Sequence, residues 1–195
     1  MNKILAAAVL AVATLAAPAY AGLPVGAAAP DFSATAAIGG KTFDFKLSEA
    51  LKKGPVVVYF FPAAFTPGCT IETNKFAEAS AEFAAAGATL IGVTGGAASP
   101  PVAGKKQDYF NAADHIDLLI KFSAEHCRDK FPIGAISPET AKAYDVPSQM
   151  KEGWSDRTSF VIAPDGKVLL SFTDPKADDH VSKTLAAVKA WKAAH

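Results

Sequence analysis

The chain of 195 residues contains few of the features that mark a specialised structural class. It has only two cysteines, Cys69 and Cys127, so it cannot build the disulfide framework of a small secreted scaffold. Its four histidines show no spacing typical of metal ligands, which argues against a metal site. Internal repeats, linkers and coiled-coil heptads are also absent, and the body of the chain therefore reads as one domain.

An excess of charge of one sign is missing as well. The sequence has 19 Lys and Arg residues against 19 Asp and Glu residues. These charges are interspersed and form no basic stripe along the chain. Such a balance argues against a nucleic acid or an anionic membrane as the main partner.

The only long apolar run lies at the N-terminus. Lys3 precedes an apolar segment at residues 4–17, and Ala19-Tyr20-Ala21 has the small-x-small pattern of a cleavage site. A membrane anchor is the alternative, but the run is short for a bilayer, which takes about 20 residues to span. We therefore expect residues 1–21 to be a secretory signal peptide and residues 22–195 to be an exported domain, with a bacterial periplasm as its destination.

Strand and helix patterns alternate along the rest of the chain. Strands are predicted at residues 31–35, 42–45, 56–61, 88–93, 131–136, 158–163 and 167–173. Helices are predicted at residues 47–52, 69–86 and 105–125, from residue 137, and at residues 178–193. The first two strands read as a hairpin, and the later order requires right-handed crossovers. This order predicts an α/β, thioredoxin-like fold with a mixed central sheet and helices on both faces.

The strongest chemical signal lies between the buried strand at residues 56–61 and the helix after it. There the sequence reads Pro62-Ala63-Ala64-Phe65-Thr66-Pro67-Gly68-Cys69. A cysteine at a helix start meets the positive end of the helix dipole and unpaired N–H groups, which favour the nucleophilic thiolate. A Thr66 hydroxyl could bond both to a thiolate and to a small substrate, and Pro62 could shield the thiolate from water. From the residues alone, a structural cysteine, a turn threonine and a strand-ending proline remain open alternatives.

The pattern Pro-x-x-x-Thr-x-x-Cys after a strand resembles the active-site signature of peroxiredoxins. Its context is similar to the Q-type branch of that family, also called bacterioferritin-comigratory proteins. Three further blocks resemble the family in the same order, so that the resemblance covers most of the chain after residue 21. They are residues 26–32 (GAAAPDF), residues 142–146 (KAYDV) and residues 157–167 (RTSFVIAPDGK).

The resemblance implies a role for each matching residue. Cys69 would be the peroxidatic cysteine, Thr66 would hold the peroxide, and Pro62 would cover the site. Arg157, otherwise a candidate for a surface salt bridge, would return to the pocket, where its planar charge can stabilise a thiolate and a polarised peroxide oxygen together. Glu72, one helical turn after Cys69, could orient Arg157 or could simply be a favourable acid early in the helix.

The chemistry implied is a thiol-dependent peroxidase without a metal or organic cofactor. Cys69 would attack hydrogen peroxide or an organic hydroperoxide and become a sulfenic acid. A second thiol would condense with it, and an external dithiol protein of the thioredoxin or glutaredoxin kind would reduce the disulfide. Relatives of the Q-type are often monomers, and we expect a monomer here.

The sequence departs from the family at the second thiol. Many Q-type members carry a resolving cysteine five residues after the first, where this chain has Asn74. Cys127 could resolve the sulfenic acid, an outside thiol could do so, or Cys69 and Cys127 could form a permanent bridge. A bond between them requires Cα atoms within ~7 Å, so we expect the start of the helix to unwind. The competing readings are a disulfide exchanger, which would need Cys-x-x-Cys, and an exported binding domain stapled by this bridge.

Overall fold

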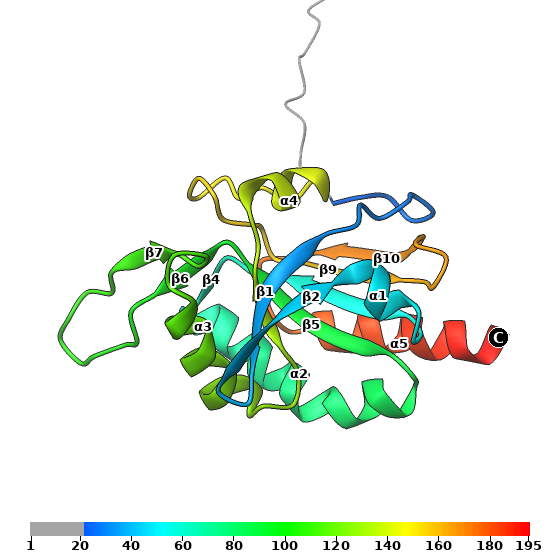
Figure 1. Cartoon of the computed structure of the whole chain (residues 1–195), viewed down its shortest axis with the longest axis horizontal. Coiled ribbons are helices and arrows are strands. Elements are labelled where there is room, and N and C mark those ends of the chain that lie inside the picture. The colour runs from blue at the N-terminus through cyan, green and yellow to red at the C-terminus, as the bar shows by residue number, and fades with distance from the viewer. Residues whose placement is uncertain (1–21) are drawn as a thin grey trace, which may run out of the picture.

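The computed structural model describes residues 22–195, and the predicted signal peptide at residues 1–21 lies outside them. Its centre is a seven-stranded sheet in the order β10-β9-β3-β5-β8-β1-β2 (Figure 1). The strands are β1 (Ser33–Ile38), β2 (Lys41–Lys46), β3 (Val56–Phe60), β5 (Thr89–Thr94), β8 (Ile133–Ala135), β9 (Thr158–Ile162) and β10 (Val168–Thr173). Strand β5 runs parallel to β3 and to β8, whereas the other neighbours are antiparallel. The predicted mixed sheet and N-terminal hairpin are confirmed.

Helices cover both faces of this sheet, as predicted (Figure 1). One face carries α2 (Pro67–Ala85), α3 (Ile116–Phe122) with the π-helix η1 (Ser123–Cys127), and α5 (His180–Ala194). The other carries α1 (Leu47–Leu51) and α4 (Pro138–Ala143). The side chains of β3 alternate between the two faces. Val57 and Tyr59 pack into the apolar core under α2, whereas Val56, Val58 and Phe60 pack into the apolar core under α1. A strand buried on both faces reads as a continuous apolar run.

Aromatic stacking attaches α2 to the centre of the sheet. The Tyr59 ring of β3 stacks on Phe76 of α2 with 4.2 Å between centroids, and Phe76 in turn contacts Phe83. All three side chains are fully buried, and burial of one large apolar side chain contributes roughly 1.5–3 kcal/mol. These contacts hold the middle of α2 against the centre of the sheet.

A second, three-stranded sheet was not predicted. It consists of β4 (Ala63–Ala64), β6 (Gly96–Ala98) and β7 (Tyr109–Asn111), in that order. The predicted helix at residues 105–125 is therefore wrong in its first half, because residues 109–111 pair with β6 and helix α3 begins only at Ile116. The side chain of Asn111 accepts a hydrogen bond from the amide of Ala113 and turns the chain there. Strand pairing in the folded chain has outweighed a helical spacing of apolar residues.

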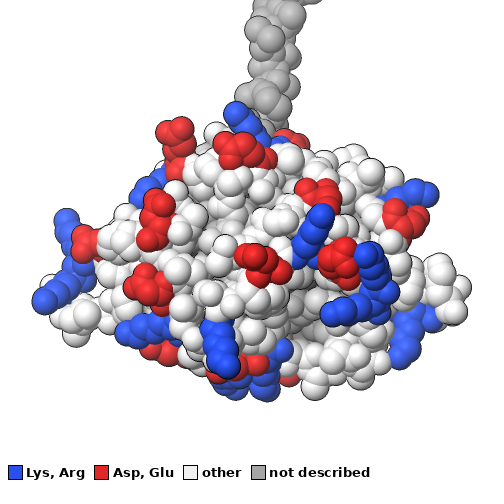
Figure 2. Space-filling model, viewed as in Figure 1, with Lys and Arg blue, Asp and Glu red and all other residues white. Residues whose placement is uncertain are grey.

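The surface shows no concentration of one charge on the face seen in Figure 2, where acidic and basic side chains are interspersed. This agrees with their equal numbers in the sequence. Between residues 22 and 195, no helix combines the length and the apolar character needed to cross a membrane.

Candidate active site

Cys69 lies in the first turn of α2, where the sequence predicts it. Thr66 is the N-cap, Pro67 occupies the first helical position, and Cys69 is the third residue of the helix. Proline fits that first position because its missing N–H would have no partner there. The amides of Gly68 and Cys69 have no intrahelical acceptor, so they are available to an anion at the helix start. The Cys69 residue itself is only 1% exposed.

The guanidinium of Arg157 approaches this thiol from the neighbouring strand. Its Nη2 donates to Sγ of Cys69 over 3.5 Å, although the two residues are 88 positions apart. The sheet explains the meeting: β9 lies antiparallel to β3 with Thr158 opposite Phe60, so Arg157 reaches the point where β3 leads toward α2. Gly68 allows the approach, because a Cβ at this position would lie 3.1 Å from Nη2 of Arg157.

Two further contacts fix the orientation of Arg157. Its Nη1 donates to Oε2 of Glu72, and its Nε donates to the carbonyl of Pro175 over 3.0 Å. Burial raises the pKa of Glu72 to about 7, even though Arg157 acts in the opposite direction. Burial acts to lower the pKa of Arg157, but Glu72 and Cys69 outweigh it and the pKa is raised. The site thus holds a permanent positive charge between a thiol and a buried carboxyl.

The loop between β4 and α2 places Thr66 at the helix start, but the hydroxyl proton of Thr66 does not point to the sulfur of Cys69. The Thr66 hydroxyl donates to the carbonyl of Ala63 over 2.9 Å, rather than to the sulfur. Phe65 adopts a left-handed backbone conformation, with φ of 63°, and its carbonyl accepts a hydrogen bond from Gln107 over 2.9 Å. Gln107 also donates to the carbonyl of Ser99, so this residue ties the 99–108 segment to the loop. The carbonyl of Pro62 accepts from the Thr94 hydroxyl over 3.1 Å.

Cys127 lies at the end of the π-helix η1, in the same apolar cluster as Cys69. It is fully buried, and both cysteines are free thiols in this structure. Burial raises the pKa of Cys127 strongly; the Ser123 hydroxyl opposes this effect and Asp129 adds to it. Arg128 and Asp129 follow in the left-handed region, with φ of 53° at both. Arg128 contacts α2 through the carbonyl of Asn74, so η1 packs beside the second and third turns of α2.

Sequence reasoning missed two residues of this region. His180, the first residue of α5, is fully buried with its Nδ1 3.6 Å from Oε1 of Glu72. Ser159 of β9 shares a hydrogen bond of 2.8 Å with the same Nδ1. A helical spacing of three residues pointed to Glu72, but His180 lies more than 100 positions from Cys69 and carries no local signal. Within residues 22–195, no group of acidic, histidine and cysteine side chains could hold a metal ion.

Comparison with known proteins identifies relatives that cover most of the chain. The AhpC/TSA family model matches residues 25–171. A Mycobacterium tuberculosis protein described as a peroxiredoxin is 32% identical over 146 residues, which are 74% of this chain and 84% of the relative. Peroxiredoxin Bcp of Bacillus subtilis is 27% identical over 140 residues, 69% of this chain and 77% of the relative.

Solved structures agree with these relatives. Peroxidoxin BcpB from Mycobacterium tuberculosis matches with a TM-score of 0.65 and 30% identity, covering 85% of this chain and 96% of that one. Peroxiredoxin Q of Xanthomonas campestris matches with a TM-score of 0.64 and 26% identity, covering 89% and 99%. The thioredoxin-like fold predicted from the order of elements is therefore confirmed.

Proposed function

Because the chain belongs to the AhpC/TSA family and is a peroxidase of the peroxiredoxin type, we propose that Cys69 is the nucleophile that reduces the peroxide. The observation that carries this proposal is the contact of 3.5 Å between Nη2 of Arg157 and Sγ of Cys69 at the first turn of α2. A guanidinium and free helix amides on one sulfur favour its thiolate, the form that attacks.

The first step is a displacement at the O–O bond. The thiolate attacks one peroxide oxygen, an S–O bond forms and the O–O bond breaks. The leaving hydroxide or alkoxide takes a proton from solvent, so that the products are water or an alcohol and a sulfenic acid on Cys69. The sulfur loses two electrons and the peroxide gains them, and no metal or organic cofactor is needed.

Residues around the sulfur have distinct tasks in this step. Arg157 donates toward the sulfur and the developing negative charge on the peroxide, as do the amides of Gly68 and Cys69. The proton of Thr66 already goes to Ala63, so the hydroxyl oxygen is oriented to accept a hydrogen bond from the peroxide O–H. We assign Pro62 the task of covering the site, because its ring adds no group that competes for the thiolate.

Cys127 is proposed to resolve the sulfenic acid. Its thiol attacks the sulfenic sulfur, water leaves, and a disulfide forms between Cys69 and Cys127. Both sulfurs are buried, so the start of α2 or the π-helix η1 must open for the Cα atoms to come within ~7 Å. A π-helix followed by two left-handed residues has fewer favourable backbone contacts than an α-helix, which makes η1 the weaker element.

An external dithiol protein of the thioredoxin or glutaredoxin kind then reduces the disulfide to two thiols. We propose that the working form is a monomer, exported to a periplasm after removal of residues 1–21. Mass determination of the protein recovered from a periplasmic extract tests the last point: a chain beginning at Gly22 supports it, and a chain retaining Met1 contradicts it.

The central experiment measures peroxide consumption by the wild type and two variants with a dithiol reductant. Wild type should turn over, Cys69→Ser should lose all activity, and Cys127→Ser should undergo one stoichiometric oxidation with slow or no turnover. Peptide mass spectrometry after one equivalent of peroxide should find the new oxygen on Cys69. Full activity of Cys69→Ser would sink the assignment. Full turnover of Cys127→Ser would mean that an outside thiol resolves the sulfenic acid. A Cys69–Cys127 disulfide that forms without peroxide would favour a permanent structural bridge.

A further inference from the structure

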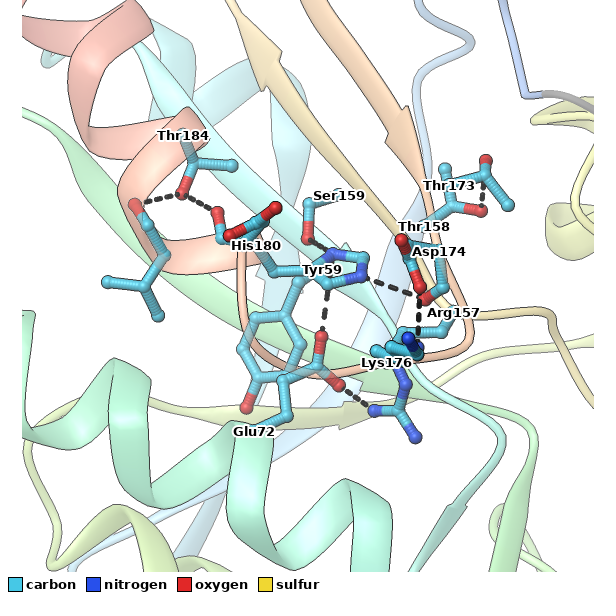
Figure 3. A network of polar contacts seen from close by, with 12 residues as sticks. Tyr59, Glu72, Arg157, Thr158, Ser159, Thr173, Asp174, Lys176, His180 and Thr184 are labelled. Atoms are coloured by element: carbon cyan, nitrogen blue, oxygen red, sulfur yellow. Dashed lines mark hydrogen bonds and ion pairs between the residues drawn. The ribbon is translucent and has the colours of Figure 1, made fainter.

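The two side chains that we assign to the peroxide, Arg157 and Thr66, are held by different parts of the molecule. Figure 3 shows the guanidinium of Arg157 directed at the carboxyl of Glu72, within a buried polar network. Thr66 is held by its own loop, because its hydroxyl and its amide both donate to the carbonyl of Ala63, over 2.9 Å and 3.4 Å. The direction of the Thr66 hydroxyl therefore depends on what holds this loop.

The small second sheet holds the first half of the loop. Ala63 and Ala64 form β4, and they pair with Gly96 and Ala97 of β6 in parallel. The pairing ends before Phe65, whose backbone is left-handed with φ of 63°. This conformation is unfavourable for a residue with a bulky side chain, and it persists only where the surroundings enforce it. The second half of the loop therefore needs a support of its own.

Gln107 supplies hydrogen bonds where the strand pairing stops. Its Nε2 donates to the carbonyl of Phe65 over 2.9 Å and to the carbonyl of Ser99 over 2.7 Å. Phe65 directly follows β4 and Ser99 directly follows β6, so the amide of Gln107 joins the two segments just beyond the last strand pair. Carbonyl oxygens can only accept, so the amide nitrogen with its two protons, and not the amide oxygen, faces both of them.

The ring of Phe65 has a separate anchor. Phe65 is only 2% exposed, and its ring meets the edge of Phe122 in α3 with 5.2 Å between the centroids. Packing of the ring does not by itself set the orientation of the peptide group between Phe65 and Thr66. That group donates its N–H to the carbonyl of Ala63 and accepts at its oxygen from Gln107. Hydrogen bonds at both ends of one peptide group strengthen each other and fix its plane.

We propose that Gln107 is a positioning residue for the peroxide step, and that it acts through the peptide group between Phe65 and Thr66. This inference rests on the proposed function. While Gln107 holds the Phe65 carbonyl, the Thr66 hydroxyl keeps its proton on Ala63 and its oxygen directed at the peroxide O–H. Without Gln107, a partly buried carbonyl loses its donor, the peptide group can rotate toward another one, and the Thr66 oxygen loses its fixed direction.

Gln107 has no such part in the ionisation of the sulfur. The groups that favour the thiolate of Cys69 are Arg157 and the amides at the start of α2, and the two hydrogen bonds from Nε2 of Gln107 go elsewhere. A change at Gln107 should therefore separate two reactions of one thiol. Oxidation by peroxide uses the Thr66 oxygen, whereas alkylation by iodoacetamide needs only the thiolate. A general loss of folded structure would change both rates.

The test measures two rates at Cys69 by peptide mass spectrometry: single-turnover oxidation by hydrogen peroxide and alkylation by iodoacetamide. Gln107→Met keeps the length of the side chain but removes both donors. Its oxidation rate should fall by about tenfold, the effect of one misdirected hydrogen bond, while its alkylation rate stays within about twofold of wild type. Gln107→Leu also lacks donors and should give the same result. In a Thr66→Val background, Gln107→Met should have no further effect on oxidation, because the oxygen it positions is gone.

Ser99→Ala is the matched control in the same segment. It removes the hydrogen bond of 3.0 Å from the amide of Asp108 to the Ser99 hydroxyl, but it leaves the carbonyl of Ser99 that accepts from Gln107. Both of its rates should equal those of wild type. Thermal unfolding checks that each variant folds.

Three results would overturn the proposal. Gln107→Met could oxidise at the wild-type rate, its oxidation and alkylation rates could fall by the same factor, or its full loss could persist in the Thr66→Val background. A wild-type protein whose Cys69 is alkylated but not oxidised by peroxide would instead overturn the proposed function, so the two failures can be told apart.

Discussion

The two cysteines share one apolar cluster and are both almost fully buried, yet their surroundings differ in one respect. Cys69 has a guanidinium within 3.5 Å and stands in the first turn of a 19-residue helix. Cys127 stands at the last residue of a five-residue π-helix, where burial and, to a lesser degree, Asp129 raise its pKa strongly and the Ser123 hydroxyl opposes this effect. We therefore expect the two thiols to differ in reactivity despite equal burial, because only Cys69 has a cationic partner for its anion.

The largest test of this difference removes the partner. Arg157→Gln should slow the first oxidation of Cys69 by about 100-fold to 1000-fold, because the developing charge loses a positioned donor. The rate of Arg157→Lys should lie between those of Arg157→Gln and wild type. An ammonium keeps the positive charge but lacks the planar guanidinium that contacts Cys69 and Glu72 together. Single-turnover quenched-flow measurements with hydrogen peroxide provide the rates.

Arg128→Gln is the matched control, because it removes a guanidinium beside Cys127 rather than Cys69. Its first oxidation should proceed at the wild-type rate. An equal loss in both arginine variants would mean that overall charge, and not the position of Arg157, governs the reaction.

A second test compares the two thiols directly. In the folded chain at pH 8, iodoacetamide should label Cys69 about 100-fold faster than Cys127, because the thiolate is the reactive form and burial raises the pKa of Cys127 strongly. In urea the two rates should agree within about twofold. Peptide mass spectrometry at timed intervals measures both, and equal labelling in the native state would contradict the comparison.

The third test concerns the carboxyl that holds Arg157. A carboxyl whose pKa rises from 4.5 in the unfolded chain to about 7 in the folded one stabilises the fold fully below pH 4.5, and this contribution is lost as the pH rises to 7. Glu72→Gln removes the titration. The free energy of unfolding of the variant, relative to wild type, should therefore increase by about 2 kcal/mol between pH 5 and pH 8.

Urea denaturation at the two pH values measures this change. Glu78→Gln makes the same charge change on an exposed position of α2 and serves as the control. A constant difference between Glu72→Gln and wild type at both pH values would show that Glu72 does not titrate in this range.

The smallest effect is expected at the π-helix. Arg128 joins its end to α2 through the carbonyl of Asn74 and an ion pair of 3.6 Å with Glu78. Exposed pairs contribute up to about 1 kcal/mol, so Arg128→Gln should speed disulfide formation after peroxide by about twofold to threefold. Non-reducing peptide maps at timed intervals follow the disulfide, and a slower rate would mean that Arg128 guides Cys127 rather than retaining it.

Much of the fold was predictable because it depends on local patterns. The continuous apolar run of β3, the proline at the start of α2 and the hairpin of β1 and β2 each carry a signal within a few residues. The predicted membership of the Q-type peroxiredoxin branch is likewise confirmed by the relatives. The helix expected at residues 105–125 was wrong in its first half, because residues 109–111 form backbone hydrogen bonds to β6. The spacing of apolar residues does not reveal such a partner.

The sequence by itself determined the position of Cys69, since a proline, a glycine and an N-cap threonine before an apolar helix dictate a helix start from neighbouring residues alone. Only the tertiary structure decided which distant side chains surround that thiol. Arg157 arrives through the pairing of β9 with β3, and His180 arrives through the packing of α5 beside them. These contacts join residues more than 80 positions apart. They form because the helices must bury the apolar faces of the sheet, and this packing brings distant parts of the chain together.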